Sequence, residues 1–110
     1  MNKALTQKSI KTNLATLDAA WELNTKGTAI TREFRFRNYI EGLIFVNRLA
    51  VHAEVLDHHP DITMKYGTVK VSLTTNELKK LSSLDFDLAK HSDTIFTLST
   101  ESKRRRTYRQ

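Results

Sequence analysis

Two adjacent histidines stand directly before the only proline of this 110-residue chain, in the stretch AEVLDHHPDIT. Imidazole gains and loses a proton near neutral pH, so a histidine side chain can act as an acid or a base in catalysis. Because the backbone before a proline is held away from the helical region, the rings of His58 and His59 should point in different directions. One ring could then exchange a proton while the other binds a ligand, although a plain polar turn could have the same sequence.

The histidines fall where a long helix should end and a strand should begin. Asn38 and Glu41 form a pattern close to the capping box that opens a helix. Apolar residues then recur at helical spacing, which predicts a helix from about Tyr39 to about Asp57. Pro60 has no backbone N–H and must end that helix nearby, and the partial negative charge at the end of the helix favours a protonated imidazole there.

The segments around this helix predict an α+β domain. A weak amphipathic helical pattern covers residues 3–20, and AAWELN is a candidate strand. The stretch AITREFRFR alternates apolar with polar side chains, with Arg32 as the exception, and DITMKYG and TVKVSLTT alternate as the two strands of a hairpin would. Ser82 and Asp85 begin a last helix. The order is α-β-β-α-β-β-α, which predicts a four-stranded antiparallel sheet with helices packed on one face.

A longer pattern connects these segments to one protein family. It is formed by Glu54-x3-His58-His59-Pro60, Tyr66 and Asp85. Together with AAWELN, FRFRNYIEGLIFVNRLAVHAE, YGTVKVSLTT and LDFDLAK, it resembles the pterin-4a-carbinolamine dehydratase family, also known as the dimerisation cofactor of a hepatocyte transcription factor. The resemblance covers roughly residues 5–96 and implies the same order of helices and strands.

Members of that family dehydrate a 4a-hydroxytetrahydropterin to the quinonoid dihydropterin, without a metal or a bound cofactor. The resemblance therefore implies that His58 is an acid–base catalyst and that His59 binds the pterin, with a share in the proton transfer left open. Glu54, one turn before His58, would orient that ring or favour its protonation. Asp85 is counted with the two histidines as catalytic, because it would accept hydrogen bonds from the pterin or support a histidine, besides capping its helix.

One position departs from the family pattern. Where the family usually has His, or in some bacterial members Trp, this chain has Asn76. Asparagine cannot exchange a proton near neutral pH but can hydrogen-bond a pterin, so Asn76 is assigned with Glu54 and Pro60 to the substrate-binding surface. The implied enzyme should be slow. The alternative is a catalytically weak homologue that acts as a protein-binding module, as a dimerisation cofactor does.

The positive charge of the chain is concentrated at its end. Of a formal net charge of +6, the last ten residues, ESKRRRTYRQ, carry +4. This divides the chain into a single domain over residues 1–100 and a basic tail over residues 101–110 that should be disordered. The tail could bind nucleic acid electrostatically, but no basic face studded with aromatic residues accompanies it, so we expect no nucleic-acid partner.

The composition also limits the kinds of site and location. The chain has no cysteine, which excludes disulfides and thiolate chemistry. No apolar run approaches the length of a membrane helix, and the first residues lack the apolar core of a secretory signal, so we expect a cytoplasmic protein without a membrane partner. We expect no metal site, because His52 and His58 are not at a helical ligand spacing and His91 has no evident partner. The resemblance implies a homodimer or a homotetramer.

Overall fold

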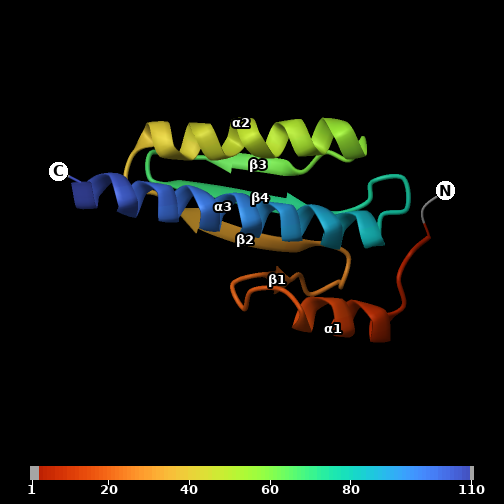
Figure 1. Ribbon diagram of the computed structural model, residues 1–110. Helices are drawn as coiled ribbons and strands as arrows, with labels where there is room; N and C mark the ends of the chain where they lie inside the picture. Colours follow the sequence, from red (N-terminus) through yellow and green to blue (C-terminus); the bar gives the residue numbers. More distant parts are fainter. Residues whose placement is uncertain (1–2, 110) are drawn as a thin grey trace.

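The helices and strands follow one another in the predicted order (Figure 1). They are α1 (Gln7–Ala15), β1 (Glu22–Leu23), β2 (Ile30–Arg35), α2 (Tyr39–Leu56), β3 (Asp61–Met64), β4 (Thr68–Leu73) and α3 (Ser83–Arg109). This computed structural model describes the backbone of residues 3–109 and the side chains of residues 3–99. The disordered basic tail predicted at residues 101–110 lies outside the residues whose side chains are described, and it stays a prediction.

The four strands form one antiparallel sheet in the order β1-β2-β4-β3. In its centre β2 pairs with β4, where Ile30 lies opposite Leu73 and Phe34 lies opposite Val69. Side chains alternate between the two faces of a strand, so these four side chains share one face, and each is at most 1% exposed. The predicted four-stranded antiparallel sheet is confirmed.

Aromatic rings on the buried face hold α2 and α3 against the sheet. The ring centroid of Phe34 lies 4.7 Å from that of Phe45 on α2 and 5.1 Å from that of Phe96 on α3. Tilted contacts of this kind add to the free energy gained by burying the rings. Because α2 and α3 contact the same ring of β2, they cover one face of the sheet, as predicted.

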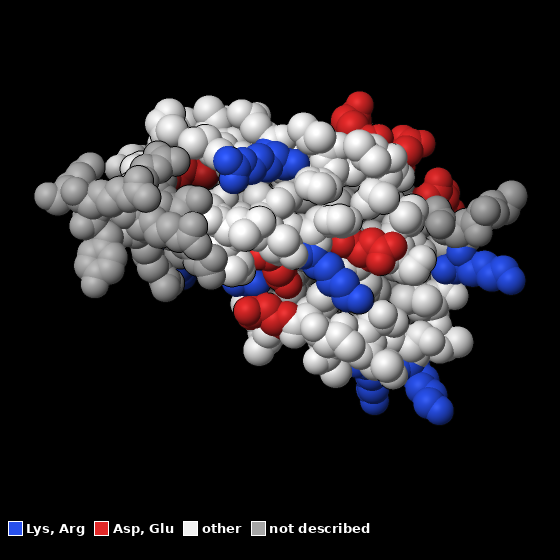
Figure 2. All heavy atoms as spheres, viewed as in Figure 1, with Lys and Arg blue, Asp and Glu red and all other residues white. Residues whose placement is uncertain are grey.

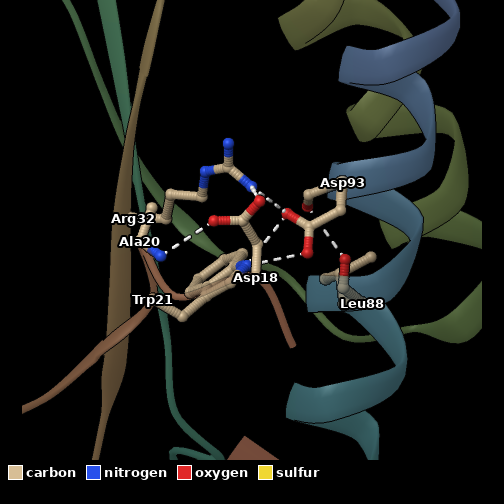
Figure 3. A network of polar contacts seen from close by, with 7 residues as sticks. Asp18, Ala20, Trp21, Arg32, Leu88 and Asp93 are labelled. Atoms are coloured by element: carbon tan, nitrogen blue, oxygen red, sulfur yellow. Dashed lines mark hydrogen bonds and ion pairs between the residues drawn. The ribbon is translucent and has the colours of Figure 1, made fainter. Parts of the chain in front are cut away.

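Arg32 interrupts the apolar alternation of β2 in order to join three parts of the chain. Its side chain is 11% exposed, and its Nη1 lies 2.8 Å from Oδ1 of Asp93 on α3. Asp93 also accepts a hydrogen bond of 2.9 Å from Nε1 of Trp21, and a carboxylate oxygen of Asp18 lies 3.7 Å from the guanidinium. Figure 3 shows how these contacts connect the segment before β1 to β2 and α3.

Burial raises the pKa of Asp93 above its usual value of 3.8. The hydrogen bond from Trp21 and the positive charge of Arg32 act in the opposite direction but do not cancel this effect, and the negative charge of Asp18 raises the pKa of Asp93 further. The folded protein therefore binds a proton at Asp93 more tightly than the unfolded chain does. The resulting stabilisation is complete below the unfolded pKa and is lost as the pH rises through the folded-state pKa.

The replacement Asp93→Asn should therefore remove a pH-dependent part of the stability. We expect the free energy of unfolding of the wild type, minus that of the variant, to fall as the pH rises from about 3 to about 6. Urea unfolding at each pH measures both values. Asp87→Asn, at an exposed position of the same helix, is the control for removing a carboxylate from α3. A difference for Asp93→Asn that stays flat or grows with pH would contradict the prediction.

Candidate active site

A tight reversal at the end of α2 determines where the two histidines lie. The helix ends at Leu56, and Asp57 adopts a left-handed backbone with φ of 50°. The N–H of His58 then donates to the carbonyl of Ala53 at 3.0 Å, as in a Schellman C-cap. Because the chain reverses at this point, the side chain of His58 is only 7% exposed, while that of His59 is 56% exposed.

The buried histidine is paired with a buried acid from the other helix. Nε2 of His58 lies 2.6 Å from Oδ1 of Asp85, which is in the first turn of α3 and is completely buried. The two residues are 27 positions apart in the sequence, and the packing of α2 against α3 brings them together. A carboxylate buried this deeply is tolerated only with hydrogen-bonded partners, so the contact with His58 helps to make the burial of Asp85 possible.

The second carboxylate oxygen of Asp85 is also fully occupied. Oδ2 accepts hydrogen bonds from the hydroxyl of Thr75 at 2.8 Å and from the backbone N–H of Ser82 at 2.9 Å. The hydroxyl of Ser82 lies 2.6 Å from that of Thr75. Asp85 thus performs its half of the predicted capping box, whereas Ser82 turns its hydroxyl to Thr75. With both oxygens engaged and no exposed surface, Asp85 is suited to supporting His58 and not to contacting a ligand directly.

Glu54 pairs with His59, whereas the sequence led us to expect it at His58. A carboxylate oxygen of Glu54 contacts Nε2 of His59, and the side chain of Glu54 is 76% exposed. The expectation for His58 assumed that the helical course of the chain continues to that residue. The left-handed Asp57 turns His58 toward the interior and brings His59 back beside the last turn of α2. The site therefore contains two separate imidazole–carboxylate pairs, one buried and one exposed.

The remaining two predicted site residues lie near these pairs without a side-chain contact to them. Asn76 follows Thr75 directly and is exposed, and its backbone carbonyl accepts a hydrogen bond from the N–H of Lys79. Pro60 follows His59 and is half-buried. Among the described residues, no hydrogen bond or ion pair joins the side chain of Asn76 to either histidine, so its amide is free to meet a ligand.

Sequence analysis missed two of the residues that shape the site, Thr75 and Ser82. Ser82 had been noticed only as the start of a capping box, and the structure adds its contact with the hydroxyl of Thr75. Thr75 is 0% exposed at the end of the LTT stretch that follows β4. A threonine that ends a strand pattern can face solvent or the interior equally well, so only the tertiary fold reveals its role.

The other two histidines form a stacked pair away from these carboxylates. The ring centroids of His52 on α2 and His91 on α3 lie 4.6 Å apart with their planes at 21°. The lone pairs of imidazole nitrogens lie in the ring plane, so two nearly parallel rings do not point them at one ion. Across the part of the chain that the structure describes, no group of three or more His, Cys, Asp or Glu residues could hold a metal ion.

Acidic side chains are exposed near the end of α2, and basic side chains are dispersed over the surface, with Lys79 and Lys80 exposed in the loop after Asn76. Figure 2 shows Asp and Glu side chains toward the end of the molecule where α2 terminates, and Lys and Arg side chains standing singly over the face in view. Glu54 and Asp57 are exposed in that part of the chain. Within residues 3–109, no helix combines the length and the apolar character that crossing a membrane requires.

The site can move protons between its imidazoles and a bound molecule. The buried pair holds one ring in a fixed orientation, and a carboxylate partner of this kind also orients the imidazole in enzymes that use histidine as an acid or a base. The exposed pair places a second ring, from the next residue, where a ligand can reach it. The arrangement suits an acid–base reaction, in which one group protonates a leaving group and another accepts a proton.

Comparison with known proteins agrees with this arrangement. The model of the family described as pterin 4 alpha carbinolamine dehydratase matches residues 3–95. A relative from Chelativorans sp. is 49% identical over 86 residues, which are 78% of this chain and 87% of the relative. One from Picosynechococcus sp. is 42% identical over 89 residues, covering 81% and 94%. The names of both relatives assign pterin-4-alpha-carbinolamine dehydratase activity only provisionally.

Solved structures show the same fold. A protein from Brucella melitensis, described as a transcriptional coactivator/pterin dehydratase, aligns with a TM-score of 0.81 and 32% identity over 86% of this chain and 99% of its own. A pterin dehydratase-like protein identified as a RuBisCO assembly factor in the alpha-carboxysome aligns with a TM-score of 0.60 and 22% identity, over 69% of this chain and 88% of its own. The second likeness shows the fold alone. With the family model matching most of its length, this chain belongs to the pterin 4 alpha carbinolamine dehydratase family.

Proposed function

We propose that this protein dehydrates 4a-hydroxytetrahydropterin to the quinonoid dihydropterin by acid–base catalysis with His58 and His59. The observation that supports the proposal most directly is the buried pair of His58 and Asp85 beside the exposed pair of His59 and Glu54. Membership of the family supplies the substrate class, and the two pairs supply groups that can carry the protons.

The reaction is an elimination of water and involves no oxidation. The C4a–O bond breaks, the departing hydroxyl takes up a proton and leaves as water, N5 loses its proton, and a double bond forms between C4a and N5. Two groups are needed, one to donate and one to accept. Because Nε2 of His58 is engaged by Asp85, Nδ1 of His58 is the atom that exchanges a proton with the substrate. His59, with Glu54 as its partner, binds the pterin and can serve the second proton.

The remaining contacts to the pterin come from residues around the two imidazoles. The side chain of Asn76 can both donate and accept hydrogen bonds, and it is exposed directly after the buried Thr75. Pro60 and Glu54 complete the binding surface on the side of α2. The proposed reaction moves only protons and water, so we propose no metal or bound cofactor, and we place the enzyme in the cytoplasm.

A second candidate function is a protein-binding role with weak or no catalysis. Asn76 replaces the usual proton-exchanging residue, and α2 presents a row of exposed apolar side chains that includes Ile40 (59% exposed), Val51 (63%) and Val55 (78%). An exposed apolar row of this kind is typical of an interaction surface. It also supports a homodimer or a homotetramer as the working form of the protein.

Replacing His58 should abolish most of the catalysis without removing the fold. In His58→Gln the side-chain amide can still donate a hydrogen bond to Asp85 but cannot exchange a proton near neutral pH. We expect kcat to fall by about 100-fold or more, the usual contribution of a positioned acid or base. Stopped-flow turnover of freshly generated 4a-hydroxytetrahydropterin measures kcat. His91→Gln, at an exposed histidine of α3, is the matched control, and full activity of His58→Gln would overturn the assignment.

Restoring an imidazole at position 76 should increase turnover. Asn76→His would supply a third group that exchanges protons near neutral pH, so we expect kcat to rise by about tenfold or more. The same stopped-flow assay checks this, with Asn47→His, at an exposed asparagine of α2, as the control for adding a histidine. An unchanged kcat would contradict the prediction. Wild type without turnover, together with activity in Asn76→His, would favour the protein-binding candidate.

A further inference from the structure

We infer that Thr75 and Ser82 are positioning residues that act through Asp85 to fix the tautomer and the orientation of His58. Neither residue is expected to touch the substrate, because Thr75 is 0% and Ser82 is 1% exposed. The inference rests on the proposed function and deepens it, since it identifies what makes Nδ1 of His58 the proton-exchanging atom.

The direction of each hydrogen bond in this network follows from the carboxylate of Asp85, which the other groups contact directly or through Thr75. An ionised carboxylate only accepts hydrogen bonds, so the hydroxyl of Thr75 must donate its single hydrogen to Oδ2 of Asp85. The hydroxyl of Ser82, 2.6 Å from that of Thr75, must then donate to Thr75. By the same reasoning, Nε2 of His58 must carry a hydrogen and donate it to Oδ1 of Asp85.

Nδ1 of His58 is the remaining nitrogen, and it retains contact with solvent. Among the described residues, the completely buried side-chain nitrogen or oxygen without a hydrogen-bond partner is Nε of Arg32. Nδ1 of His58 also forms no hydrogen bond to the described residues, but unlike Nε of Arg32 it is not completely buried. The atom therefore keeps some contact with solvent. The network thus holds one nitrogen of the ring inside the protein and leaves the other for a ligand.

The turn between β4 and α3 holds the hydroxyls of Thr75 and Ser82 within hydrogen-bonding distance of each other. The N–H of Thr75 donates to the carbonyl of Lys80 at 3.0 Å, and this bridge closes a loop that begins at Asn76. Ser82 then contributes its backbone N–H to Asp85 at 2.9 Å. Without the hydroxyl of Thr75, Oδ2 of Asp85 would lose one of its two donors, and Ser82 would lose its acceptor. The carboxylate could then rotate, and His58 would lose its fixed partner.

The experiment compares Thr75→Val, which removes the hydroxyl at nearly constant volume, with Thr75→Ser, which retains it. Nitrogen-15 NMR of the full chain without ligand reports which nitrogen of His58 carries the hydrogen. We expect Thr75→Val to reduce the preference for hydrogen on Nε2 and to lower kcat by about tenfold, the typical cost of losing an outer partner of a functional histidine, while KM stays unchanged. Thr75→Ser should retain both properties.

Thr74→Val is the matched control, because the hydroxyl of Thr74 donates to the backbone carbonyl of Thr28, outside the network. The inference is overturned if Thr75→Val keeps the wild-type tautomer of His58, or if Thr75→Ser loses the tautomer as Thr75→Val does. Ser82→Ala removes the donor to Thr75 but leaves both donors to Oδ2 of Asp85, so it should change the tautomer less. Thr75→Ala removes the same hydroxyl and is the variant to use if Thr75→Val does not fold. The NMR result does not depend on turnover, so a protein without dehydratase activity would refute the proposed function and leave this test valid.

Discussion

The complete burial of the Asp85 carboxylate is the constraint on which the site depends. A carboxylate without exposed surface must have each oxygen hydrogen-bonded. Here the donors are His58 just after α2, Thr75 just after β4 and the backbone N–H of Ser82 just before α3. His58 lies 27 residues before Asp85 in the sequence, whereas Thr75 and Ser82 lie close to it. The requirement to satisfy one charge therefore fixes the relative positions of both helices at the end of the molecule where His58 lies.

A second, partly buried carboxylate on the same helix, Asp93, has a different role. It is paired with Arg32 and Trp21, and the contacts join α3 to the sheet and to the segment before β1. Its pKa is raised because this pairing does not fully compensate for burial. α3 thus carries one acid that holds the ring of His58 and one that attaches the helix to the sheet. Asp93 therefore contributes to the stability of the domain, whereas Asp85 contributes to the geometry of the site.

The order of elements could be predicted because it depends on local patterns, such as the alternation around Phe34 and the cap at Asn38. His58 and His59 could be singled out by their place at a helix end before Pro60 and by the family pattern around them. The partner of each histidine could not, because it depends on the left-handed backbone of Asp57, which aspartate tolerates but does not require. For the same reason Glu54 was expected at the wrong ring, and the inward direction of Thr75 was invisible without the packing of β4 against α3.

The adjacent residues Thr75 and Asn76 differ in how strongly they are bound into the fold. Thr75 is buried and tied to Asp85, so its replacement disturbs a satisfied network in the interior. Asn76 is exposed and its side chain forms no hydrogen bond to the other described residues, so replacing it by histidine should cost little stability. Position 76 can therefore be replaced without removing a partner from the pair of His58 and Asp85. The proposed catalysis and the stability of the fold are thus separable at position 76, whereas at position 75 they are coupled through Asp85.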